Sequence, residues 1–168
     1  RVTDNGTDFV ELSWEPARNA SSYCVYYRER DRNEDVIDLT DGTWDTIGSD
    51  STKVALENLE KGKTYTIAIR ADSPNYEGVP SRPRNFSTQR PQSVIAESEI
   101  VKLTSSKPFA IDAEANSKLS FSSSDPKVIE VEEDTGKAVV KGAGRAKITV
   151  TAAESTNYTD AEKEINVM

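Results

Sequence analysis

The sequence predicts an all-β chain made of two tandem β-sandwiches. Apolar residues alternate with polar ones in many short segments, and Gly, Pro, Asn and Asp separate these segments. Residues 59–71 give the strongest local pattern, because a turn at Gly62 precedes a strand in which Tyr65, Ile67 and Ile69 share one face. The length of 168 residues suits two small domains, and the composition changes beyond Pro91.

A leucine, a glycine turn and a tyrosine that opens a strand are the arrangement of a tyrosine corner. In such a corner the ring packs inward and its hydroxyl bonds to the backbone of the turn. We therefore predict that the hydroxyl of Tyr65 bonds within residues 59–62. The ring should share one core with the other inward residues of the first half, namely Trp14, Tyr23, Val25, Leu59 and Ile67.

Alternation and turn residues also predict the other strands of the first half, at residues 10–14, 23–27, 52–56 and 84–88. Tyr23, Val25 and Tyr27 face inward in the second of these strands, so Cys24 and Tyr26 should point outward.

Two segments of the first half predict loops. Residues 31–50 hold seven acidic residues and one basic residue, and we expect a long loop there with a short strand around Trp44. Residues 72–78 are dense in turn-forming residues and predict a second loop.

Residues 1–90 resemble a fibronectin type III domain. The resemblance rests on Leu12-Ser13-Trp14, on Tyr23-x-Val25-x-Tyr27, on Trp44, and on Leu59-x-x-Gly62-x-x-Tyr65 with Ala71 and Gly78. It implies a β-sandwich in which the strand after Gly62 is the sixth. The sequence departs from the family in a short first strand at Arg1 and in a long acidic segment at residues 31–50.

The second half predicts another β unit, with strands at residues 119–123, 128–131, 138–140, 146–151 and 163–167. This half, residues 91–168, resembles the bacterial immunoglobulin-like domains of exported surface proteins. The motifs are Phe-Ser-Ser-Ser-Asp-Pro-Lys-Val from Phe121, Gly136-Lys137 before Val140, Lys-Gly-x-Gly-x-Ala-x-Ile-x-Val from Lys141, and Asn157-Tyr158. The resemblance implies an extracellular or bacterial cell-surface location in a multidomain protein.

Composition excludes several classes of partner. The net charge is −8, with 12 basic and 16 acidic residues in 1–90 and 9 and 13 in 91–168, so we expect no nucleic-acid partner. No apolar run approaches the roughly 18 residues that span a bilayer, so we expect no membrane insertion.

A single cysteine excludes an internal disulfide, and the absence of histidine removes the commonest general base and metal ligand.

Three aromatic residues are candidate contacts for a ligand or partner. Tyr26 and Trp44 should lie on neighbouring strands, and if both point outward they form a platform that could stack on a sugar or anchor a protein. Tyr76 lies in an exposed loop after Pro74. The alternative for Trp44 is that it only covers the edge of the sheet.

Three other sequence patterns resemble functional motifs, but each lacks a feature that the motif requires. Asp31, Asn33 and Asp35 copy the first ligands of a calcium loop, but Val36 replaces the required Gly, so the segment is not an EF-hand. A calcium site of another kind in this acidic loop is the alternative, and we predict no dedicated metal site, because an acidic solvated loop is the ordinary explanation. The Gly142-Ala143-Gly144 segment precedes a strand, which predicts a hairpin turn and no nucleotide loop. Cys24 has no histidine partner for nucleophilic catalysis.

The sequence thus predicts a non-enzymatic segment with no cofactor, acting as a spacer and adhesion module of a bacterial surface or secreted protein. One alternative is a carbohydrate-binding accessory region of an extracellular glycan-degrading enzyme. Another is a protein–protein interaction segment whose first module faces a receptor. Expected partners are a host or bacterial surface protein or glycan and flanking domains of the same polypeptide, and we expect a monomer.

Residues 89–92 form the predicted linker. Four extended residues span only about 14 Å, and Pro91 favours an extended backbone at Arg90. We therefore expect an elongated, end-to-end pair of modules, as a spacer requires, and small-angle scattering would contradict this by showing the modules side by side.

Overall fold

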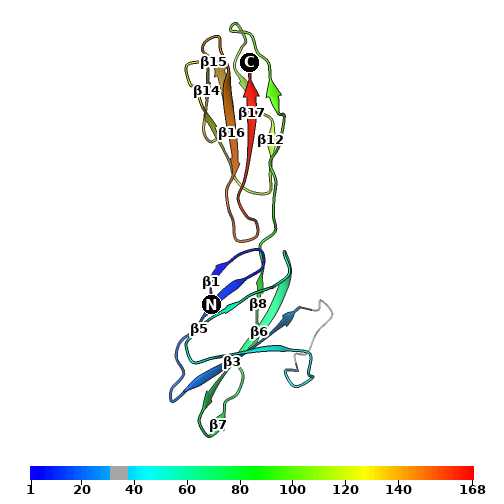
Figure 1. Cartoon of the computed structure of the whole chain (residues 1–168), viewed down its shortest axis with the longest axis vertical. Coiled ribbons are helices and arrows are strands. Elements are labelled where there is room, and N and C mark those ends of the chain that lie inside the picture. The colour runs from blue at the N-terminus through cyan, green and yellow to red at the C-terminus, as the bar shows by residue number, and fades with distance from the viewer. Residues whose placement is uncertain (31–37) are drawn as a thin grey trace. The chain divides into compact units, whose positions relative to one another are not determined.

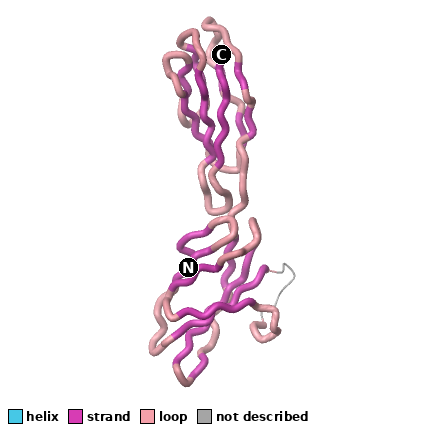
Figure 2. Tube along the Cα trace, in the orientation of Figure 1, coloured by secondary structure: helices cyan, strands magenta, loops and turns pink. Residues whose placement is uncertain are grey.

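The computed structural model describes residues 1–30 and 38–168, and the chain forms two compact units, Arg1–Arg90 and Pro91–Met168 (Figure 1). Every regular element in the described residues is a strand (Figure 2). The predicted all-β fold of sandwiched sheets is confirmed. In this described part, no helix has the length and apolar character to cross a bilayer.

Two antiparallel sheets build the first unit. One sheet has the order β1-β2-β5, with β1 at Val2–Asn5, β2 at Val10–Ser13 and β5 at Lys53–Leu56. The other has the order β4-β3-β6-β7, and β8 also pairs with β6. Its strands are β3 at Ser22–Glu29, β4 at Asp45–Ser49, β6 at Thr64–Ser73, β7 at Tyr76–Glu77 and β8 at Arg84–Ser87.

The core of the first unit lies between these sheets. Its buried apolar side chains are Val10, Leu12, Val25, Leu56, Leu59, Tyr65, Ile67 and Phe86. Of the six residues expected in the core, Trp14 is the exception, because its indole is only half-buried and lines a groove at the margin of the sandwich. The Trp14 ring packs edge-on against the buried Tyr23, with 5.3 Å between centroids.

The tyrosine corner is confirmed. The backbone N–H of Glu60 donates a 2.9 Å hydrogen bond to the hydroxyl of Tyr65, and the Tyr65 ring stacks on Phe86 in the core. Gly62 adopts φ of 64°, a left-handed conformation that a residue with a side chain resists. The turn and the strand that follows it are therefore fixed to each other by one side chain.

Removing the hydroxyl of Tyr65 tests this bond. Tyr65→Phe leaves the part-buried N–H of Glu60 without its acceptor, so we expect a loss of about 1 kcal/mol in the unfolding free energy of the first unit. Denaturant titration followed by tryptophan fluorescence measures it, because both tryptophans, Trp14 and Trp44, lie in this unit. Tyr76→Phe is the matched control, since Tyr76 is 69% exposed, and an equal loss in both variants would contradict the corner.

Two local expectations for the first unit need correction. Trp44 does not lie within a strand but immediately precedes β4, because the turn before it is held by the side chain of Asp41, which accepts from the backbone N–H of Thr43. Residues 72–78 are not an open loop, because β6 continues to Ser73 and pairs with β7 in a hairpin. The carboxylate of Asp72 stabilises the hairpin by accepting from the backbone N–H of Gly78.

The second unit contains nine strands. They are β9 at Ile95–Ala96, β10 at Glu99–Ile100, β11 at Phe109–Ala110, β12 at Ala113–Glu114, β13 at Leu119–Ser123, β14 at Ile129–Val131, β15 at Lys137–Val140, β16 at Ala146–Ala152 and β17 at Ala161–Val167. One sheet has the order β10-β17-β16-β13, a second has β11-β15-β14, and β12 pairs with β9. The pairing of β10 with β17 is parallel.

Ile129, Ile148 and Ile165 are fully buried at the centre of the second unit. Around them the core contains Val94, Ile111, Phe121, Ala138, Ala146, Val150, Ala152 and Val167. β16 lies between β17 and β13, and it turns every second residue into this core over its whole length.

The ends of the predicted linker each belong to one unit. In the first unit, the N–H of Gln89 donates to the carbonyl of Gly6 at 2.8 Å. In the second, the side chain of Gln92 accepts from the N–H of Asn116 and donates to the carbonyls of Ala153 and Thr159. Gln89 is therefore bonded within the first unit and Gln92 within the second.

Candidate functional site

The outward face of the β4-β3-β6-β8 sheet brings together most of the candidate side chains. Because Tyr23 and Val25 point into the core, Cys24, Tyr26 and Arg28 on β3 point away from it. Register places Ala68 of β6 beside Tyr26. We call this surface the outer face, and its members on β3, β4 and β6 are Cys24, Tyr26, Arg28, Thr46, Gly48, Thr66, Ala68 and Arg70.

Small residues form the floor of the outer face and large ones cover it. Ala68 has 0% exposure and Thr66 has 2%, although both lie on the side of the sheet that is turned away from the core. The side chains of Tyr26, Arg28 and Arg70 on the same face surround them, so the sheet is covered by long side chains with polar ends. The outer face is therefore an amphipathic surface with apolar stems and guanidinium and hydroxyl groups.

Arg70 organises one part of this face. Its guanidinium donates to both carboxylate oxygens of Asp72, at 2.8 and 3.0 Å, and to the hydroxyl of Tyr26 at 2.8 Å. It also forms an ion pair with Glu77 of β7 at 3.3 Å. Burial raises the pKa of the Tyr26 hydroxyl further above the neutral range. The forked bonds fix the Arg70 side chain in one orientation.

Arg28 organises a second part, at the start of β4. Its guanidinium lies 4.2 Å from the ring centroid of Trp44 in a cation–π contact, and it forms an ion pair with Asp41 at 3.0 Å. The indole N–H of Trp44 donates to the carbonyl of Asp38 at 2.8 Å. Trp44 is therefore held by Arg28 from the sheet and by the backbone of the preceding turn.

The expected aromatic platform takes a different form. Within residues 1–30 and 38–168, the rings of Tyr26 and Trp44 make no contact with each other, and each is paired with its own arginine. Tyr76 is separate from both, because Glu77 points to the outer face and its neighbour on the strand points to the opposite side. The structure brings Tyr26 together with Arg70 and Trp44 together with Arg28.

The arginines are the part that sequence reasoning missed. Arg28 could have been found, since it lies two residues after Tyr26 on an alternating strand and so shares its face. Arg70 could not, because its place beside Cys24 and Tyr26 depends on how β3 pairs with β6.

The described residues offer binding groups and no clustered metal ligands. No group of three or more Cys, Asp or Glu side chains in this part of the chain could hold a metal ion. The candidate calcium ligands Asp31, Asn33 and Asp35 lie outside the described residues. Cys24 is half-buried on the outer face. The chemistry of the face is thus stacking, hydrogen bonding and charge pairing.

Comparison with protein families settles the identity of the first unit. The profile of the fibronectin type III domain matches residues 1–87, which is just over half of the chain. The chain belongs to the fibronectin type III family. A second profile, described as the immunoglobulin-like domain of intimin, matches residues 112–154. Comparison with curated protein sequences gives no match.

Solved structures with the same kind of fold include a fragment of intimin. The C-terminal 282-residue fragment, in complex with the intimin-binding domain of the translocated intimin receptor, aligns with a TM-score of 0.50 and 12% identity, covering 98% of this chain and 61% of that chain. A segment of two fibronectin type III domains from chicken tenascin gives a TM-score of 0.43 and 15% identity, with coverage of 99% and 94%. The fibronectin type III domain of human collagen alpha-1(XX) gives 0.42 and 17%, with coverage of 52% and 78%.

The Arg70–Asp72 pair makes a pH-dependent prediction. Hydrogen bonds from Arg70 hold the pKa of Asp72 below its usual range of about 4. The pair therefore stabilises the first unit above the unfolded pKa and loses this effect as pH falls through the lower, folded pKa. Asp72→Asn should cost about 1 kcal/mol at neutral pH and nothing in strong acid, as judged by denaturant titrations across pH. Asp50→Asn, at an exposed aspartate, is the control, and a pH-independent cost for Asp72→Asn would contradict the assignment.

Proposed function

We propose that this fibronectin type III family chain is a non-catalytic pair of β-sandwich domains, 1–90 and 91–168, from a bacterial cell-surface or secreted protein. In that setting it acts as a spacer and as an adhesion module that binds a surface protein of a host or of another bacterium. The observation that carries the proposal is the match of residues 112–154 to the immunoglobulin-like domain of intimin, in the same chain as a fibronectin type III domain.

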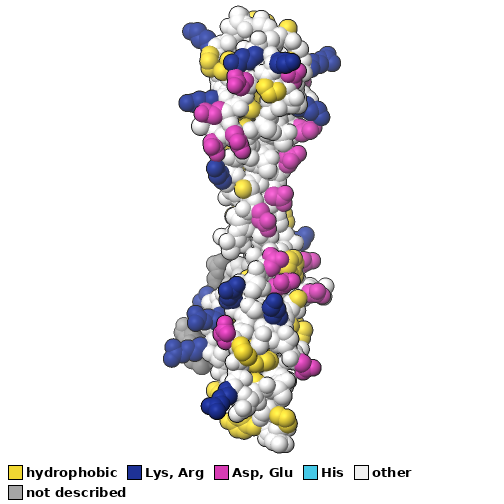
Figure 3. Space-filling model, turned by 90° about the vertical axis from the view of Figure 1, so that its left-hand side faces the viewer, with side chains coloured by type: hydrophobic (Ala, Val, Ile, Leu, Met, Phe, Trp, Pro, Cys, Tyr) yellow, Lys and Arg dark blue, Asp and Glu magenta, His cyan; other side chains and the backbone are white. Residues whose placement is uncertain are grey.

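The binding part of the proposal rests on the outer face. Tyr26, Trp44, Arg28 and Arg70 are of the residue types that most often anchor protein interfaces, and their arginine pairings hold the rings in place before a partner arrives. Acidic and basic side chains are interspersed on the surface shown in Figure 3, which suits a protein partner better than a phosphate backbone. Tyr76 offers a separate contact on the hairpin.

Adhesion of coated beads tests the binding part. Beads that carry residues 1–168 should attach to epithelial cells or to bacteria, and protease treatment of those cells should abolish attachment. Trp44→Ala should reduce attachment, because it removes an aromatic anchor and its cation–π contact with Arg28, whereas Tyr158→Ala in the second unit is the control.

A glycan array distinguishes the alternative function. Binding of the chain to defined glycans, together with attachment that survives protease treatment, would support a carbohydrate-binding accessory region in place of a protein adhesin. Attachment of uncoated and coated beads to the same extent would reduce the proposed role to that of a spacer.

A further inference from the structure

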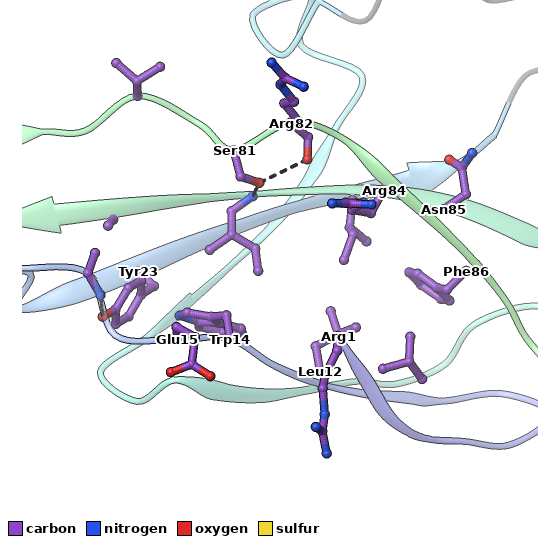
Figure 4. A pocket seen from close by; sticks show the side chains of 16 residues that line it. Arg1, Leu12, Trp14, Glu15, Tyr23, Ser81, Arg82, Arg84, Asn85 and Phe86 are labelled. Carbon is purple, nitrogen blue, oxygen red and sulfur yellow. Dashed lines mark hydrogen bonds between the residues drawn. The ribbon is translucent and has the colours of Figure 1, made fainter.

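A groove of about 680 Å³ opens between the two sheets of the first unit, away from the outer face (Figure 4). Its walls come from β2 on one sheet and from β6 and β8 on the other, and its floor is formed by Leu12, Trp14, Tyr23, Ile67, Ile69 and Phe86. The two sheets therefore diverge along this margin, where the half-buried side chains of Trp14 and Ile69 lie above the buried core.

Exposed apolar residues continue the floor to the surface. Val79, between β7 and β8, is 83% exposed, and Val2 of β1 is 42% exposed, and both line the groove. Val2 pairs with Leu12 and so points toward the core side of its sheet, yet much of it remains open to solvent. An apolar side chain placed in the groove would cover Val2, Val79 and the indole of Trp14 together.

Three arginines and one glutamate line the same groove. Arg1, Arg82 and Arg84 are exposed, and in the described part of the chain their guanidinium groups make no hydrogen bond or ion pair. Glu15 is the carboxylate of the lining, and it lies on the same side of the groove as Arg1, across from Arg82 and Arg84. In a chain with a net charge of −8, this is a local excess of positive charge beside an apolar surface. Such a margin is complementary to an anionic partner.

The strands beside the groove leave backbone groups for a further strand. Among the described residues, β1 pairs only with β2 and β8 pairs only with β6, so both are edge strands, although the carbonyl of Ser87 at the end of β8 already accepts from the side chain of Asn5. An edge strand can accept an extended peptide through main-chain hydrogen bonds, while a neighbouring pocket takes alternate side chains. The groove thus combines an apolar pocket, cationic groups and an open edge at one place.

We propose that this groove binds an extended acidic segment of a partner protein, with an apolar side chain in the pocket and flanking carboxylates on Arg82 and Arg84. The apolar floor supplies the affinity and the arginines select for acidic residues on either side of the anchor. The residues that carry this proposal differ from those named for the outer face. The peptide site can therefore be tested independently of the adhesion function proposed above.

Two synthetic peptides test the proposal by NMR of the ¹⁵N-labelled chain. One has the sequence acetyl-Asp-Glu-Leu-Phe-Leu-Glu-Asp-amide, and the other has lysine in place of every acid. The acidic peptide should shift the indole resonance of Trp14 and the amide resonances of Val79 and Phe86, whereas the indole of Trp44, on the outer face, should stay unchanged. The lysine peptide should cause no shifts at the same concentrations.

Charge reversal at the groove provides the quantitative comparison. Arg82→Glu with Arg84→Glu should weaken binding of the acidic peptide by at least about tenfold, which corresponds to about 1.4 kcal/mol. Both residues are exposed, so the fold should be retained. Lys61→Glu is the control, because it reverses the charge of an exposed residue of the same unit outside the groove. Val79→Asp should also weaken binding, as it removes apolar surface and adds a like charge.

Several results would overturn the proposal. These are equal shifts with both peptides, equal weakening by Lys61→Glu, or shifts that map to the outer face. Shifts of the Trp14 indole that depend on protein concentration without peptide would assign the groove to a second copy of the chain. If the protein isolated from its cell shows Trp14 already covered and the acidic peptide does not bind, the groove is filled by the polypeptide itself.

Discussion

Ile148→Ala is expected to lower the unfolding free energy of the second unit by about 4 kcal/mol. Ile148 has 0% exposure on the central strand β16, between β13 and β17, so truncation removes buried methyl groups and leaves a cavity. Circular dichroism of the whole chain should show an earlier transition. Tryptophan fluorescence should not change, because both tryptophans lie in the first unit.

Lys147→Ala provides the comparison for this variant. Lys147 precedes Ile148 on β16 and points outward, where its ammonium pairs with Glu164 at 2.7 Å in an exposed ion pair. Exposed pairs contribute little, so the transition should hardly move. A loss of similar size at both positions would contradict the register of β16. A parallel loss in the tryptophan signal would contradict two domains that unfold separately.

Gly136→Val should destabilise the second unit by about 3 kcal/mol or more. Gly136 has φ of 66°, and a Cβ atom there would lie 2.9 Å from the ring of Phe121, which is buried in the core. A β-branched residue thus meets an unfavourable backbone conformation and a ring that cannot move freely. Denaturant titration followed by circular dichroism measures the loss.

A second background separates the two causes. In a Phe121→Leu chain the ring is gone, so Gly136→Ala should cost less than it does in the original chain, and only the backbone cost should remain. Gly48→Val is the control for added volume, because a Cβ at Gly48 meets no atom within 4 Å. Equal costs of Gly136→Ala in both backgrounds would contradict the packing of Phe121 on this turn.

The longer strands could be predicted from the sequence because their alternation is local. In β3, β6, β13 and β16 the side that faces the core follows from the order of apolar and polar residues alone. The strands β9 to β12 could not be predicted, because each has two residues and two residues cannot show a period. The hairpin at β7 was missed for the same reason, and its turn residues indicated only a loop.

The candidate site was predictable only where it follows from one strand. Alternation places Tyr26 on the outer face, and this expectation is met, but the pairing of Arg70 with Tyr26 arises from contacts between residues 44 positions apart. For Trp14 the local pattern gave a wrong expectation. Its strand pattern predicts burial, but the separation of the two sheets at that margin leaves it beside a groove.

Surface labelling of intact cells tests the proposed function most directly. Antibodies raised against residues 1–168 are applied to the cells that produce the protein, before and after permeabilisation, and to the culture medium. We predict labelling of intact cells or recovery of the protein from the medium, with loss of the cell-bound form on brief protease treatment. Labelling that requires permeabilisation, with no protein in the medium, would contradict a surface or secreted module.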